Sequence, residues 1–405
     1  MPRVLIVGTL DTKGAEIGYV RDLIQGAGCA TTVLDCGVMG EPAFAPEISS
    51  DEVAAAAGTT VAAIREAGDR GQAVTAMTAG VARLVAGLAE QGGVDGLISL
   101  GGSAGTTIGT SAMRALPVGV PKVMVSTLAS GDTRPYVDAR DICMMYSVVD
   151  IAGLNRISRR VFANAARAVA AMALGGEGPE PATDRPLVGA TMFGVTTPCV
   201  TAVRERLEAA GYEVLVFHAT GTGGQAMEGL VRDGLITGVV DVTTTEWCDE
   251  LVGGVLSAGP ERLNAAAEAG VPQVIVPGAM DMVNFGPLDS VPQQFRARRL
   301  YVHNPTVTLM RTTREECAEL GRILAERAGR ARGPTVVLLP LRGVSAIDQE
   351  GGPFHDAEAD AALFEAVERH APPALTVRRV EAHINDPEFA AVVADTFLEL
   401  AAPAT

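Results

Sequence analysis

Two short segments in the first half of the chain carry residue types that suit phosphate binding. Residues 101–107 read GGSAGTT, where glycines permit close backbone approach and hydroxyls stand at an expected helix start. Residues 9–13 read TLDTK and bring hydroxyls, a carboxylate and an ammonium together. Amides at a helix start bind anionic oxygens, and the lysine adds a positive charge. We predict a phosphate site here, with simple helix capping by Asp11 or Thr12 as the alternative.

Neither segment is a standard nucleotide fingerprint. No Gly-Lys-Ser/Thr follows the glycines as a P-loop requires, and the GxGxxG spacing of dinucleotide sites fails after Gly101. The small polar residues after residue 125 are expected to complete the same pocket. The predicted nucleotide-binding residues are Thr9, Asp11, Lys13, Gly101, Gly102, Ser103, Gly105, Thr106, Thr107, Ser126 and Thr127.

The second half places a different set of polar residues at the ends of its expected strands. A GTGG turn at 221–224 enters a helix that carries Glu228, a candidate acid or base. His218, His303 and His383 each lie at or just after the end of an expected strand, and His303 is the second candidate catalytic residue. The predicted ligands of a small anionic substrate are Gly221, Thr222, Gly223, Gly224, Asp281, Asn304, Arg311 and Arg342. The alternative is that these residues cap helices and line an interface.

Parallel α/β sheets are the elements that could bring such residues together. Short β-branched runs alternate with Ala-rich helical stretches throughout the chain, which is typical of βαβ units. Ligands of such sheets bind beyond the carboxyl ends of the strands. Strands are expected at 4–7, 32–35, 96–100, 122–126, 142–146, 187–191, 214–218, 238–242, 273–276, 299–302, 335–339 and 375–379. Helices are expected at 15–25, 72–90, 106–115, 155–174, 197–210, 312–328, 356–370 and 387–401.

A polar stretch rich in Gly and Pro divides the chain. We expect an α/β domain over 1–175, a linker over 176–186 and a second α/β domain over 187–405. Each would be a doubly wound, mostly parallel, Rossmann-like sheet, and both halves open with a strand, a small-residue turn and a helix. An ancient duplication would explain this similarity. The crossover at 36–50 is long for an αβ connection, which suggests a functional or interfacial role.

Composition excludes several classes of protein. The net charge of −16 argues against nucleic-acid binding, which needs a basic face. The 6 cysteines lie apart, several in apolar runs, so we expect reduced thiols and neither a disulfide nor a bound structural metal. No apolar run reaches the roughly 18 residues that span a membrane. A cytoplasmic protein that forms a homo-oligomer is expected.

The motifs together resemble a known but uncharacterised family. Residues 7–14 (VGTLDTKG), 69–73 (DRGQA), 100–106 (LGGSAGT), 221–228 (GTGGQAME) and 302–305 (VHNP) are similar to bacterial proteins and to the N-terminal domain of the plant tomato-mosaic-virus resistance protein. The resemblance runs from about residue 3 to residue 400. It implies a two-domain α/β fold with ATP, and with it Mg²⁺, bound in the first domain.

Two functions remain open at this point. The first is an ATP-dependent enzyme of small-molecule metabolism that acts on an organic acid. The second is a nucleotide-binding regulatory or interaction module without turnover. The polar residues of the second half favour the enzyme, and the lack of a recognised catalytic motif favours the module.

Overall fold

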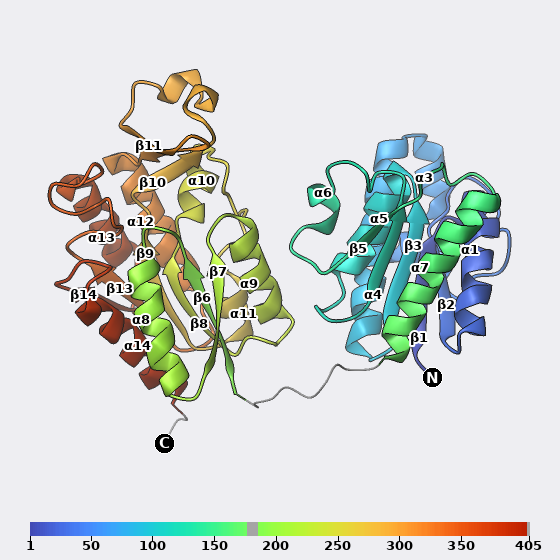
Figure 1. The fold of residues 1–405 in the computed structure, drawn as a ribbon, viewed down its shortest axis with the longest axis horizontal. Coiled ribbons are helices and arrows are strands. Elements are labelled where there is room, and N and C mark those ends of the chain that lie inside the picture. Colours follow the sequence, from blue (N-terminus) through green and yellow to red (C-terminus); the bar gives the residue numbers. More distant parts are fainter. Residues whose placement is uncertain (176–184, 403–405) are drawn as a thin grey trace. The chain divides into compact units, whose positions relative to one another are not determined.

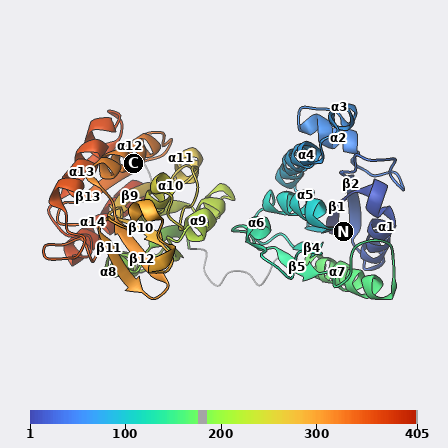
Figure 2. The same ribbon diagram turned by 90° about the horizontal axis from the view of Figure 1, so that it is seen from above.

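The computed structural model describes residues 1–175 and 185–402, which form two compact units, Met1–Pro181 and Ala182–Thr405 (Figures 1 and 2). Most of the linker expected at 176–186 lies outside the described residues. Both units are α/β with parallel central sheets, so the predicted Rossmann-like fold class is confirmed.

A five-stranded parallel sheet in the order β2-β1-β3-β4-β5 forms the centre of the first unit. Its strands are β1 (Arg3–Gly8), β2 (Ala30–Asp35), β3 (Gly96–Gly101), β4 (Lys122–Ser126) and β5 (Cys143–Tyr146). Its helices are α1 (Leu10–Gly26), α2 (Ser50–Ala56), α3 (Val61–Ala67), α4 (Arg70–Glu90), α5 (Ser103–Arg114), α6 (Arg134–Val137) and α7 (Arg156–Leu174).

Both faces of this sheet are covered, and the strands are apolar for that reason. Alternate side chains of β1 show the pattern: Val4 and Ile6 pack under α1 and α7, whereas Leu5 and Val7 pack under α2, α4 and α5. Figure 2 shows α4 and α5 on one side of the sheet and α7 on the other. By length and composition, one helix of the described residues, α4, could cross a membrane; here it packs against α2 and α5.

A six-stranded parallel sheet in the order β14-β13-β9-β8-β6-β7 forms the centre of the second unit. Its strands are β6 (Leu187–Met192), β7 (Glu213–His218), β8 (Gly238–Thr243), β9 (Gln273–Gly278), β13 (Thr335–Pro340) and β14 (Thr376–Val380). Its helices are α8 (Thr197–Ala209), α9 (Thr222–Arg232), α10 (Glu246–Val252), α11 (Ala265–Ala269), α12 (Arg314–Ala328), α13 (Ala357–His370) and α14 (Pro387–Ala401). Helices α8 and α14 cover one face, and α10, α12 and α13 cover the other.

A small antiparallel sheet is inserted between β9 and α12. It contains β10 (Met282–Phe285), β12 (Val307–Arg311) and β11 (Leu300–Asn304), in the order β10-β12-β11. The strand expected at 299–302 is β11, so it belongs to this sheet and not to the parallel one. Two short 3-10 turns, Leu288–Ser290 and Gln293–Phe295, lie between β10 and β11.

Candidate functional site

In the first unit, the two predicted phosphate-binding turns follow neighbouring strands. Strands β1 and β3 pair directly, while β2 lies on the other side of β1. The strand order therefore reverses between β1 and β3. This reversal is where open α/β sheets form their ligand crevice, beyond the carboxyl ends of the strands. The structure thus brings residues 9–13 and 101–107 to the same switch point.

The turn from β3 into α5 contains two glycines with different roles. A Cβ on Gly101 would lie 2.6 Å from Cα of Gly105, so glycine is required there for packing against the helix. A Cβ on Gly102 would contact only Thr127, at 3.8 Å from Oγ1. No side chain caps the N-terminus of α5. The start of α5 therefore offers amide donors, with open space beside Gly102.

The predicted hydroxyls at this turn make internal hydrogen bonds. Oγ1 of Thr106 and Oγ of Ser126 are buried and 2.6 Å apart, and Ser126 Oγ also accepts from the Leu128 amide at 2.9 Å. Thr107 donates to the carbonyl of Ser103. The Thr127 amide donates to the carbonyl of Gly101. Thr106 and Ser126 thus join the loops after β3 and β4.

The charged residues after β1 hold two other segments against this turn. Oδ2 of Asp11 accepts from the amides of Met39 and Gly40, at 2.7 and 3.2 Å, so the long crossover 36–49 packs over the start of α1. The Lys13 ammonium donates to the carbonyl of Ile151, in the segment after β5. Oδ1 of Asp11 is buried and has no hydrogen-bond partner among the described residues. The hydroxyls of Thr9 and Thr12 bond to each other at 2.7 Å.

The switch point of the second unit is filled by its own side chains. Here the order reverses between β6 and β8, as it does in the first unit. The guanidinium of Arg262 is buried at this point and bonds both oxygens of Asp241, at 2.5 and 2.7 Å, and Oε2 of Glu246 at 2.6 Å. Glu228 lies 3.4 Å away. We refer to Arg262, Asp241, Glu246 and Glu228 as the Arg262 cluster.

The glycine turn predicted to bind an anion already holds a carboxylate of the chain. Oε1 of Glu246 accepts from the amides of Gly221 and Gly224, at 2.8 and 3.1 Å. Glu228 is buried and accepts from the amides of Leu263 and Ala265, both at 2.7 Å. Burial raises the pKa of Glu228, and Arg262 opposes that rise. These residues therefore form an internal network, and a ligand at this turn would have to displace Glu246.

A second buried group of charges surrounds Arg311. Nη2 of Arg311 contacts Oδ1 of Asp360 at 2.5 Å and lies 3.7 Å from Oδ1 of Asp348. Asp281 accepts from Ser345 Oγ at 2.8 Å. Oδ1 of Asp281 and Oδ1 of Asp348 are buried without a hydrogen-bond partner in the described residues. We refer to Arg311, Asp281, Asp348 and Asp360 as the Arg311 cluster.

Three carboxylates share one guanidinium in the Arg311 cluster, and all four side chains are buried. Burial raises the pKa of Asp281, with a further rise from Asp348 and a reduction from Arg311. Burial and then Asp348 raise the pKa of Asp360 to about 8, again opposed by Arg311. Burial and mutual repulsion in the cluster therefore favour the protonated forms of Asp281 and Asp360 more than exposure to water would.

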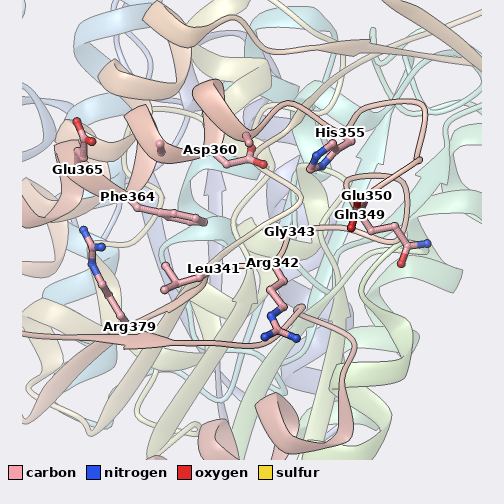
Figure 3. Close-up of a pocket in the computed structure, with 12 residues that line it drawn as sticks. Leu341, Arg342, Gly343, Gln349, Glu350, His355, Asp360, Phe364, Glu365 and Arg379 are labelled. Carbon is pink, nitrogen blue, oxygen red and sulfur yellow. The ribbon is translucent and has the colours of Figure 1, made fainter.

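A pocket of about 680 Å³ opens beside the Arg311 cluster, at the carboxyl ends of β13 and β14 (Figure 3). Asp360 joins the two, because it contacts Arg311 and also lines the pocket. Arg342, His355 and Arg379 add cationic or titratable groups to the wall. The other lining residues are Leu341, Gly343, Gln349, Glu350, Ala357, Ala361, Phe364 and Glu365.

The structure brings only part of the predicted substrate site together. Arg342 lines the pocket, while Arg311 and Asp281 belong to the cluster behind it. His303 and Asn304 lie on the exposed strand β11 and are not among the lining residues; Oδ1 of Asn304 accepts from Thr306 in a local turn. The turn at 221–224 and Glu228 belong to the Arg262 cluster.

Nothing in the sequence indicated that Asp360 and His355 would lie at this pocket, or Asp348 in the Arg311 cluster. Asp360 falls inside the helix expected at 356–370, and only the buried face of that helix distinguishes it. Asp348 and His355 come from the loop after β13, which has no apolar period. Among the described residues, no group of three or more His, Cys, Asp or Glu side chains is arranged to hold a metal ion.

Comparison with known proteins gives matches to a family that is described as uncharacterised. A model described as "Uncharacterised protein family (UPF0261) N-terminal domain" matches residues 2–177, and its C-terminal counterpart matches residues 185–401. A UPF0261 protein of Clostridium tetani is 52% identical over 98% of both chains. The ToMV resistance protein Tm-1 of Solanum lycopersicum is 39% identical over 98% of this chain and 56% of its own length.

Solved structures are only distantly similar. A putative UDP-N-acetylglucosamine 2-epimerase from Listeria monocytogenes has a TM-score of 0.24 and 12% identity, over 67% of this chain and 78% of that chain. A Streptomyces glycosyltransferase complexed with thymidine diphosphate has a TM-score of 0.18 and 13% identity, over 99% and 96%. Similarity at this level carries no argument about function.

Proposed function

The chain belongs to the uncharacterised UPF0261 family, and we propose that its first unit binds ATP at the turns after β1 and β3, in an ATP-dependent enzyme that acts on a small organic acid. The observation that carries the nucleotide site is the switch point between β1 and β3, where both predicted turns meet. The choice of ATP rests on the family resemblance of the sequence motifs.

Local geometry at the switch point supports a phosphate ligand. The uncapped start of α5 presents amide donors, and Gly102 leaves room for the approach of an anion. Mg²⁺ binds oxygen ligands and usually keeps several waters. The carboxylate of Asp11 provides oxygens of that kind, and it would hold the ion through water.

Calorimetric titration of the full chain with ATP and Mg²⁺ tests the proposal. Gly102→Val should weaken binding roughly tenfold or more, because a branched side chain would fill the space at the amide donors. Lys13→Ala should also weaken it, through loss of a charge near the phosphates. Gly26→Val is the matched control, since a Cβ at Gly26 meets nothing within 4 Å and the residue ends α1.

Unchanged affinity in both Gly102→Val and Lys13→Ala would show that ATP does not bind at this turn.

A turnover assay distinguishes the two functions that the sequence left open. ATP hydrolysis that depends on an added organic acid supports the enzyme. ATP binding with no turnover in the presence of such acids would instead support the regulatory module.

A further inference from the structure

We propose that the pocket beside the Arg311 cluster binds a small carboxylate at Arg342 and takes up a proton at Asp360 when the ligand binds. This inference rests on the proposed organic-acid activity for the ligand's class, but it concerns a separate site in the second unit. It does not require ATP.

The side chain of Arg342 is suited to hold a carboxylate. Its Nε donates to Oε1 of Glu381, at 3.3 Å. Its terminal nitrogens Nη1 and Nη2 make no hydrogen bond within the described residues, and the side chain lines the pocket. A guanidinium with two free nitrogens can bind a carboxylate through two parallel hydrogen bonds. By contrast, Arg379 on the same wall is already held by both oxygens of Glu368, at 2.6 and 2.5 Å.

Asp360, on α13, lies in the wall of the same pocket. Its Oδ1 bonds Arg311, and its Oδ2 makes no hydrogen bond within the described residues while the residue lines the pocket. A bound anion near Oδ2 favours the protonated carboxyl, which can then donate a hydrogen bond to the ligand. Asp281 and Asp348 behind it add negative charge and favour the same proton.

The neighbouring charges do not reverse this expectation. Glu350 and Glu365 are exposed at the rim, where water screens them. The titratable and charged groups around Asp360 are Arg311 on β12, Cys317 on α12, Asp281 after β9, Arg342, Asp348, Glu350, His355 and Asp356 after β13, Glu365 on α13 and Arg379 on β14.

Titration calorimetry of the full chain without ATP, using acetate, succinate and citrate as separate probes, tests this site. At least one carboxylate should bind, and Arg342→Ala should weaken it roughly tenfold or more. Affinity should fall by up to about tenfold per pH unit above the pKa of Asp360, since the ionised carboxylate would repel the ligand. Asp360→Asn should keep binding and remove this pH dependence, because the amide also donates a hydrogen bond.

Arg378→Ala is the matched control, since Arg378 is an exposed arginine on the neighbouring strand β14, and its side chain contacts Thr396 and Glu399 on α14. It should leave binding unchanged. The proposal is overturned if no probe binds, if Arg342→Ala binds as tightly as the parent chain, or if the pH dependence survives in Asp360→Asn. Tighter binding of inorganic phosphate than of every carboxylate would also overturn it. A failure here leaves ATP binding in the first unit intact, so the two proposals fail separately.

Discussion

At the scale of single residues, Arg262 is the side chain that balances three buried carboxylates. It lies among Asp241, Glu246 and Glu228 with 1% of its side chain exposed. Burial raises the pKa of both Glu228 and Glu246, and Arg262 counteracts the rise. Removing one partner of a buried ion network leaves charges without compensation, which costs more than the intact network contributes.

We expect Arg262→Met to destabilise the second unit by about 3–5 kcal/mol, as for other broken buried ion pairs. Trp247 on α10 is the single tryptophan of the chain, so its fluorescence reports urea unfolding of this unit. Arg232→Met is the control: Arg232 also contacts Glu228, at 3.4 Å, but its side chain is 43% exposed, and its loss should cost no more than about 1 kcal/mol. Equal urea midpoints for the two variants would show that the buried contacts of Arg262 stabilise the unit no more than the exposed contact of Arg232 does.

At the scale of elements, the two glycines of the turn between β3 and α5 have different roles: Gly101 packs against the helix, and Gly102 leaves space for a ligand. Gly101→Ala places a Cβ against the backbone of Gly105, and we expect a local destabilisation of about 1–3 kcal/mol. Gly102→Ala should leave the turn intact, since its Cβ has ordinary room. Hydrogen exchange of peptides that cover β3 and α5 should be faster only in Gly101→Ala. Similar exchange in both variants would mean that the close approach at Gly101 is not required.

The sequence predicted this turn better than it predicted the sites of the second unit. Continuous apolar runs such as those of β1 and β3 are typical of strands covered on both faces, and no expected bound of these two strands differs from the observed one by more than one residue. The sequence predicts that both turns lie at the carboxyl edge of a sheet. It does not predict that they lie side by side, because strand order is set by long-range packing. The structure supplies that order and places the turns on neighbouring strands.

The small antiparallel sheet and the two charge clusters had no comparable local signal. Strand β11 was expected, but its partner β12 was not, since nothing in a short run states which strand it will pair with. Arg262 lies in the connection between α10 and α11, and its partners are 16 to 34 residues away in sequence. Asp360 looks like one acidic residue among several on an amphipathic helix. Only burial against Arg311 makes it distinctive.

At the scale of the whole molecule, the cysteines report how well the interior of each unit is closed to solvent. Cys29, Cys36, Cys199, Cys248 and Cys317 are buried, and Cys143 is exposed on the edge strand β5. Burial raises the pKa of Cys199 to about 12 and that of Cys317 to about 11, which further suppresses their thiolates.

A soluble thiol reagent should therefore label one cysteine in the native chain and all 6 after unfolding in denaturant, counted by mass spectrometry. Cys143→Ser should remove the native label. Rapid modification of a second thiol under native conditions would show that one of the cores is more open than described. If a reductant increased the number of thiols labelled in the unfolded chain, the parent protein would contain a disulfide.

The two units have the same order for their first strands, β2-β1-β3-β4-β5 in one and β7-β6-β8-β9-β13 in the other. A tandem duplication would produce such a match. Their switch points nevertheless differ: the first has an uncapped helix start, whereas in the second Glu246 already occupies the glycine turn.

Glu246 behaves like a ligand that is tethered to its own receptor. It cannot diffuse away, so the fold around it is complete at any metabolite concentration. A site filled from solution stabilises its unit only in proportion to the logarithm of the free ligand concentration. Under the proposed function, a fall in cellular nucleotide would loosen the first unit and leave the second unaffected, and proteases would find the N-terminal half first.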